Sequence, residues 1–213
     1  MKIRSTVLAA SAAAALGLGL LAPAAASADE PPGTTSLAEV LTSDGNQFDR
    51  NKYDYDIVTE AVLAVLAAKP DSPVGVLADG TVPLTAFIPN DRAFRILTKD
   101  LTGQWYWKES RVFSELAGAA GIDTIEAVLL YHVVPGATID SGTALASDGA
   151  ALKTALGATF TVDVVDPSVP KVFLRDNDPS DFDPLLIASQ LDINAGNLQI
   201  AHGIRLVLRP LDL

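Results

Sequence analysis

The stretch Tyr131-His132-Val133-Val134-Pro135-Gly136 decides how the fold of this chain is interpreted, because it marks the end of an amphipathic helix. Upstream, one apolar face has the i, i+3, i+4, i+7 spacing of a buried helical stripe: Ile125, Val128, Leu129 and His132. Proline cannot continue a helix and glycine suits its left-handed cap, so we expect the helix to stop at Pro135 and Gly136. His132 is therefore expected to be buried, and a buried histidine needs a hydrogen-bond partner.

The order of the remaining elements predicts the fold class. Apolar stripes of helical period, with start or stop signals at their ends, predict helices at 57–69, 91–101, 110–120 and 123–134. Period-two alternation and short apolar runs predict strands at 84–88, 151–156, 159–165, 171–175 and 203–209, the second and third forming a hairpin. Helices come first and strands last, without a β-α-β rhythm. This order favours an α+β fold over a doubly wound parallel sheet.

Residues 1–28 have the three-part pattern of a secretory signal peptide. Lys2 and Arg4 precede an apolar run from Val7 to Ala22, and Ala26-Ser27-Ala28 supplies a cleavage site of small residues. A membrane anchor is the alternative, but this apolar core is short for a span. We expect cleavage before Asp29, a flexible segment at 29–36 and a single domain at 37–213. The mature protein is then secreted, with no stable membrane insertion.

Charge and cysteine content exclude several classes of function. The chain has 15 basic and 26 acidic residues, for a net charge of −11. This balance argues against nucleic acid and against phosphate-rich wall polymers as partners, because phosphates recruit lysine and arginine. The chain has no cysteine, which removes thiol catalysis, thiolate metal sites and disulfides. A domain of this length can instead be held together by burial.

The sequence offers little for catalysis. His132 and His202 are its two histidines, and both lie in apolar surroundings. Neither a Gly-x-Ser-x-Gly elbow nor a His-Glu-x-x-His zinc motif is present. We therefore expect no catalytic residue and no cofactor. The alternative is an extracellular hydrolase with an unrecognised site.

Two polar or aromatic segments are candidates for binding. Trp105-Tyr106-Trp107 either forms an exposed recognition patch or packs a loop onto the core. Four carboxylates at Asp176, Asp178, Asp181 and Asp183 could bind Ca²⁺ in a calcium-dependent matrix protein. In an EF-hand alignment, however, Asp181 stands where glycine is needed and Ile187 where glutamate is needed. A solvated acidic loop is the alternative that we favour, so no metal site is expected.

Three segments together resemble the fasciclin domain family. Residues 85–94, Thr-Ala-Phe-Ile-Pro-Asn-Asp-Arg-Ala-Phe, look like its first signature box. Residues 129–136 look like its central Tyr-His segment, and residues 197–204, Asn-Leu-Gln-Ile-Ala-His-Gly-Ile, like its second box. The resemblance covers about 37–213. The chain departs from the pattern at Arg205, where the family usually has an aspartate.

The resemblance implies an α+β fold, a fasciclin-like β-wedge or sandwich with several packed α-helices. It also implies an extracellular module for adhesion or matrix interaction, in which Tyr131 and His132 are linked to recognition. The helical spacing around His132 favours a structural role for this pair instead, and the same holds for His202. We therefore expect a secreted, non-catalytic module that binds an extracellular protein or glycan, with Tyr131, His132, Trp105 and Trp107 as candidate binding residues.

Overall fold

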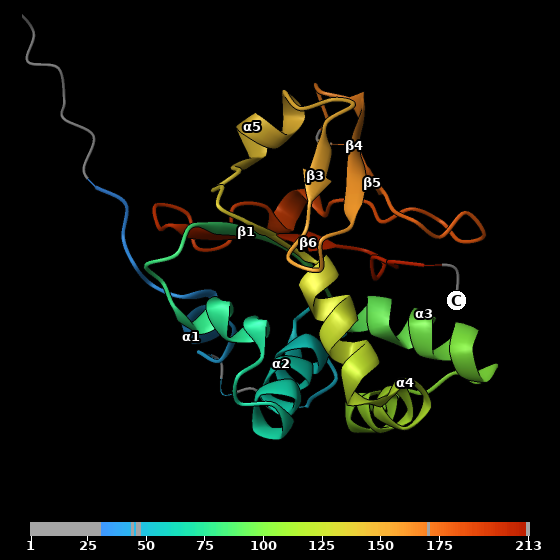
Figure 1. The fold of residues 1–213 in the computed structure, drawn as a ribbon. Coiled ribbons are helices and arrows are strands. Elements are labelled where there is room, and N and C mark those ends of the chain that lie inside the picture. Colours follow the sequence, from blue (N-terminus) through green and yellow to red (C-terminus); the bar gives the residue numbers. More distant parts are fainter. Residues whose placement is uncertain (1–30, 44, 46–47, 170, 212–213) are drawn as a thin grey trace, which may run out of the picture. The chain divides into compact units, whose positions relative to one another are not determined.

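The fold contains two small β-sheets, one at its centre and one above it (Figure 1). The computed structural model describes residues 31–211 apart from 44, 46, 47 and 170, so the signal peptide expected at 1–28 lies outside the described residues. Within the described part, the central sheet has the order β2-β1-β6, with β1 (Leu84–Pro89), β2 (Val133–Pro135) and β6 (Gln199–Ile204). The upper sheet has the order β3-β4-β5, with β3 (Ala151–Lys153), β4 (Thr159–Asp166) and β5 (Lys171–Arg175).

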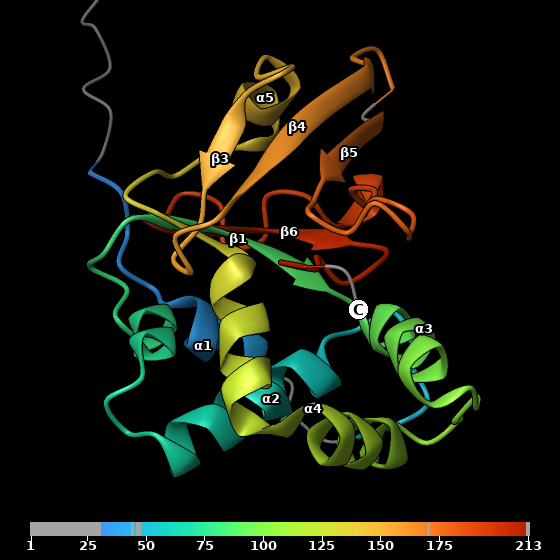
Figure 2. The same ribbon diagram turned by 45° about the vertical axis from the view of Figure 1, so that its right-hand side comes forward.

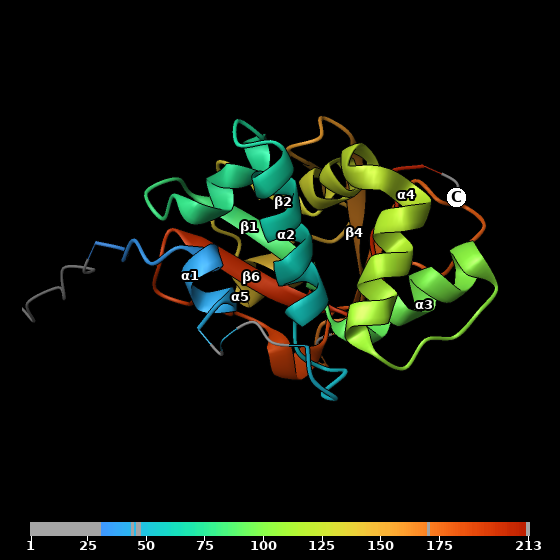
Figure 3. The same ribbon diagram turned by 90° about the horizontal axis from the view of Figure 1, so that it is seen from below.

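Helices cover one face of the central sheet, and the upper sheet stands over its other face (Figures 2 and 3). The helical layer contains α1 (Leu37–Leu41), α2 (Asp56–Ala68), α3 (Asp91–Thr102) and α4 (Glu109–Tyr131). Shorter elements complete the described chain: α5 (Ser141–Leu145) and the 3₁₀ turns η1 (Pro73–Ala78) and η2 (Ala188–Gln190). Helices and strands are thus largely segregated, and the expected α+β fold is confirmed.

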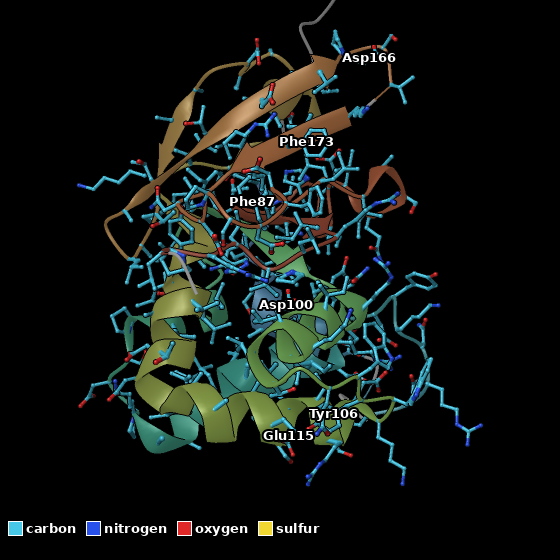
Figure 4. The ribbon with its side chains drawn as sticks, turned by 90° about the vertical axis from the view of Figure 1, so that its right-hand side faces the viewer. Phe87, Asp100, Tyr106, Glu115, Asp166 and Phe173 are labelled. Carbon is cyan, nitrogen blue, oxygen red and sulfur yellow. The ribbon has the colours of Figure 1, made fainter. Side chains whose placement is uncertain are left out.

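Strand β1 separates two apolar clusters. All six of its residues are buried, and successive side chains point to opposite faces. Ala86 and Ile88 pack into the helical cluster, whereas Phe87 packs into the cluster between the two sheets. The ring of Phe87 meets that of Phe160 edge to face, at 5.3 Å between ring centroids. Figure 4 shows Phe87 between the upper strands and the helices.

The end of the helix before His132 differs from the prediction. The expected break at Gly121 is present as a kink with φ of 75°, but the helix stops at Tyr131 and His132 is its cap. Pro135 does not end the helix and instead belongs to β2, which pairs antiparallel with β1 at the edge of the central sheet. An edge strand tolerates proline because a missing N–H breaks no central ladder. Long-range pairing therefore set this boundary, not the local stop signal.

The last strand also begins earlier than predicted. The sequence predicts a strand at 203–209, but β6 spans Gln199–Ile204 and runs parallel to β1, with Leu84 opposite Gln199. Arg209, at the end of the predicted strand, lies beyond β6 and is only 6% exposed. The hairpin of β3 with β4 and the strand at 171–175 are confirmed.

Part of the segment expected to be flexible, 29–36, is hydrogen bonded to the domain. Gly33 donates its N–H to the carbonyl of Gly196 at 2.8 Å and accepts from Leu198 at 2.9 Å. The N–H of Thr35 donates to Oδ1 of Asn197 at 3.0 Å, and Ser36 caps α1. These contacts join the start of the described chain to the loop before β6.

Replacing Phe87 with alanine is expected to destabilise the fold strongly. Phe87 is 1% exposed, so F87A leaves a cavity between the two sheets and should lower the free energy of unfolding by about 3–5 kcal/mol. Phe182 is 85% exposed, so F182A is the matched control and should change it by less than about 0.5 kcal/mol. Urea unfolding measures both. Equal effects of the two variants would contradict the assigned packing.

Candidate functional site

Tyr131 and His132 are buried and hydrogen bonded within the domain. The Tyr131 hydroxyl donates to the carbonyl of Thr159 at 2.9 Å. His132 Nδ1 lies 2.7 Å from the carbonyl of Val128, and Nε2 accepts the N–H of Leu208 at 2.9 Å. Nδ1 must therefore carry the proton of a neutral ring, and burial lowers the pKa of His132 to about 4. These bonds support the structural alternative for the pair, whose part in recognition stays a prediction.

His202 has a similar environment. Its ring is fully buried, with Nε2 2.8 Å from the carbonyl of Ile139 and Nδ1 accepting the N–H of Asp192 at 3.3 Å. Burial lowers the pKa of His202 as well. Both histidines thus bond backbone groups through their two ring nitrogens, and neither lines the two surface hollows described below.

The segment from Trp105 to Trp107 is divided between the core and the surface. Tyr106 is half-buried against the helical cluster and lies at the outer edge of the helical layer (Figure 4). Trp107 is 76% exposed, and its ring meets that of Trp105 edge to face at 5.9 Å between ring centroids. The packing alternative therefore holds for Tyr106 and is wrong for Trp107.

Trp107 borders the first of two neighbouring surface hollows, each of about 630 Å³. Residues 48–50 and 52 line the first hollow, and the next residue, Tyr53, lines the second hollow. The N–H of Arg92, in the second hollow, donates to the carbonyl of Lys52, in the first, at 2.9 Å. Five exposed basic residues, which we call the basic surface, line the two hollows: Arg50, Lys52, Arg92, Lys108 and Arg205.

The basic surface is not neutralised by the protein itself. Across the described residues, none of its five side chains lies within 4.0 Å of a carboxylate. Lys52 lies over the ring of Tyr53, 5.0 Å from its centroid, and Tyr53 is 54% exposed. Cationic groups and aromatic faces are therefore presented together. Sequence reasoning found Trp107 but missed this surface, because its residues come from four distant segments.

The carboxylates at 176–183 are bound by arginines. Arg209 is 6% exposed and donates to Asp178 at 3.2 Å, with Asp181 and Asp100 each 2.8 Å away. Arg175 pairs with Asp183 and with Asp163. Asp178 is only 4% exposed, so the expectation of a solvated loop is wrong there. Because these carboxylates form ion pairs with arginines, the structure gives no support to calcium binding by the segment 176–183.

A different group of carboxylates gathers at the starts of three helices. Asp54, Asp91 and Glu109 each place an oxygen within 4.8 Å of the others, a spacing that a metal ion can bridge. Burial raises the pKa of Asp91 to about 9 against the opposing effect of the Ile57 N–H, and the nearby Asp54 and Glu109 add to the rise. Asp91 and Glu109 each occupy the first turn of a helix, where the positive helix end favours a carboxylate, but no local pattern joins them to Asp54.

An apolar cavity of about 380 Å³, partly open to solvent, also lies between α2, α3 and α4 in the helical layer. Thr124 is the one hydroxyl-bearing residue that lines it, and the others are apolar, including Phe94, Leu97, Phe113 and Val128. Ligand sites usually add placed polar groups that orient the ligand. This cavity therefore has a weaker claim to function than the basic surface.

We expect His132 to make the fold sensitive to acid. The pKa of His132 is lowered from 6.5 to about 4, so the folded state resists protonation of this ring. The neutral ring therefore contributes to the free energy of unfolding above pH 6.5, and this contribution is lost as pH falls toward 4. The loss is on the order of 3 kcal/mol. H132A should cost about 1–3 kcal/mol at pH 7.5 and should flatten this part of the pH profile.

Urea unfolding of the wild type and H132A at pH 7.5 and pH 5 measures both effects. The raised pKa of Asp91 has the opposite effect, because the stability that Asp91 contributes falls as pH rises. Both proteins contain Asp91, so the difference between their unfolding free energies isolates the effect of His132. An H132A variant of unchanged stability that loses partner binding would make His132 a recognition residue instead.

Among the described residues, no helix combines the length and the apolar character needed to cross a membrane. No family model matches the chain, and neither does any curated protein. A solved structure that is similar is that of a FAS1 domain pair from the insect cell adhesion molecule fasciclin I. The TM-score is 0.53 and the sequence identity 13%, over 83% of this chain and 51% of that chain.

The chain thus spans about half the length of that domain pair, and at 13% identity the likeness concerns the fold. It agrees with the three sequence segments at 85–94, 129–136 and 197–204, which occupy β1, the end of α4 with β2, and β6. The central sheet is therefore built from the three segments that carry the resemblance. The chain has a fasciclin-like α+β fold.

Proposed function

We propose that this chain is a secreted, non-catalytic interaction module that binds an extracellular anionic glycan through the basic surface and Trp107. The observation that carries the proposal is the grouping of Arg50, Lys52, Arg92, Lys108 and Arg205, exposed and without ion pairs among the described residues, in a chain of net charge −11. Cations that protein carboxylates leave unpaired are available to carboxylate or sulfate groups of a partner.

The aromatic residues favour a glycan over an acidic protein segment. Trp107 is 76% exposed beside the first hollow, and Tyr53 is 54% exposed in the second. A sugar ring offers an apolar C–H face to such rings, while its acidic substituents reach neighbouring cations. Arginine adds a planar fork that binds a carboxylate with two parallel hydrogen bonds.

The setting supports an extracellular role. The similar solved structure comes from a cell adhesion molecule, and residues 1–28 have the pattern of an export signal. The hydrolase alternative has less support, because neither surface hollow is lined by a histidine and both histidines bind backbone groups. We therefore place the protein outside the cell, as a module that holds a glycan without changing it.

Binding to an immobilised polyuronate tests this function, with a neutral glucan as the reference polymer. We expect saturable binding to the polyuronate alone, weakened by raising NaCl from 0.15 to 0.6 M because salt screens exposed charges. W107A and the double variant R92Q/R205Q should each weaken binding about tenfold, which corresponds to about 1.4 kcal/mol. K153Q removes an exposed lysine on β3, outside the basic surface, and is the matched control.

Two outcomes would contradict the proposal. Preferential binding to a poly-glutamate peptide, lost in R92Q/R205Q but kept in W107A, would assign an acidic protein partner instead of a glycan. Equal loss of binding in K153Q and R92Q/R205Q would show that net charge, and not the basic surface, controls the interaction.

A further inference from the structure

Three carboxylates meet where the helical layer borders the first hollow. Asp91 and Glu109 are the first residues of α3 and α4, and Asp54 lies two residues before α2. Their oxygens all lie within 4.8 Å of one another. Two oxygens bound to one Ca²⁺ ion are at most about 5 Å apart, since each bond is about 2.3–2.6 Å long. The three carboxylates therefore have the spacing of ligands to a single ion.

One oxygen of this cluster has no donor that accounts for it. Asp91 is fully buried, and its Oδ1 accepts the N–H of Ile57 at 3.0 Å. Its Oδ2 is also buried and accepts no hydrogen bond among the described residues. A buried carboxylate oxygen without a partner is rare in folded proteins, because the group loses its hydration and gains nothing in return. Asp91 Oδ2 therefore calls for a positive partner, either a bound ion or a proton shared with the neighbouring Asp54.

Glu109 has partners within the protein. Glu109 is 1% exposed, with Oε1 2.6 Å from the guanidinium of Arg95 and Oε2 accepting the N–H of Asp49 at 2.6 Å. Arg95 thus forms an ion pair with Glu109.

We propose that Asp54, Asp91 and Glu109 bind a divalent cation of the Ca²⁺ class. Carboxylate oxygens are the ligands that such hard ions prefer, and Ca²⁺ accepts irregular sets completed by water. Glu109 and Asp49 line the first hollow, which gives water and the ion a route to the cluster. This inference does not depend on the glycan proposal, because the basic surface and the carboxylate cluster are tested by different variants.

The ion would fasten three helix starts together. Asp91 already bonds the first turn of α2 through Ile57, and Glu109 bonds the loop at Asp49. A shared ion would extend these bonds to Asp54, which follows the loop carrying Arg50 and Lys52. The competing explanation is a proton held between Asp91 and Asp54. The positive ends of the helices would then stabilise the negative charge that remains.

A bound ion and a shared proton are distinguished by calorimetric titration of the chelator-treated full chain at pH 7.5, with CaCl₂ and separately with MgCl₂. We expect one Ca²⁺ per chain with a Kd of about 10⁻⁴–10⁻³ M, the range of extracellular modules. At ten times Kd the unfolding constant should fall about elevenfold, which raises Tm by about 3–6 °C. D91N and E109Q should each lose this binding and the rise in Tm.

D181N is the matched control, since it removes a carboxylate from the segment 176–183 while leaving the cluster intact. D91N should fold even without calcium, because it removes a buried charge and keeps an oxygen for the N–H of Ile57. The proposal is overturned if Ca²⁺ gives no heat and no change in Tm with the wild type. It is equally overturned if D91N binds Ca²⁺ as the wild type does, or if D181N alone abolishes binding.

Discussion

The parallel pairing of β1 with β6 is the constraint on which the rest of the structure depends. It runs from Leu84 opposite Gln199 to Pro89 opposite Ile204 and joins segments that are far apart in sequence. Parallel strands need a long connection, and here helices α3 and α4 and the whole upper sheet lie between them in sequence. Helices cover one face of the pair and the upper sheet the other, so all twelve of these residues are buried.

Burial on both faces means that polar side chains in these strands must find partners inside the protein. Gln199 accepts the N–H of Leu37 at 2.8 Å and donates to the carbonyls of Val76 and Asp79, each at 2.8 Å. His202, three residues later, holds the backbone at Ile139. The polar residues of β6 thus attach α1, η1 and the segment before α5 to the central sheet. Such bonds within the protein explain why these strands contain a histidine, without any role in binding a partner.

The sequence could predict whatever depends on neighbouring residues. The strand at 84–88, the hairpin around Gly157 and the break at Gly121 rest on local patterns, and the structure contains all three. The end of α4 and the start of β6 depend on pairing with β1, which no local pattern contains.

The same distinction separates the candidate sites. The dense acidic run at 176–183 was visible in the sequence, but its partner Arg209 is far along the chain. The cluster of Asp54, Asp91 and Glu109 was invisible, because its members lie on three separate segments that meet only in the folded protein. Net charge was similarly uninformative. At physiological ionic strength the screening length is about 8 Å, so a partner at the basic surface responds mainly to charges in contact with it, and distant carboxylates contribute little.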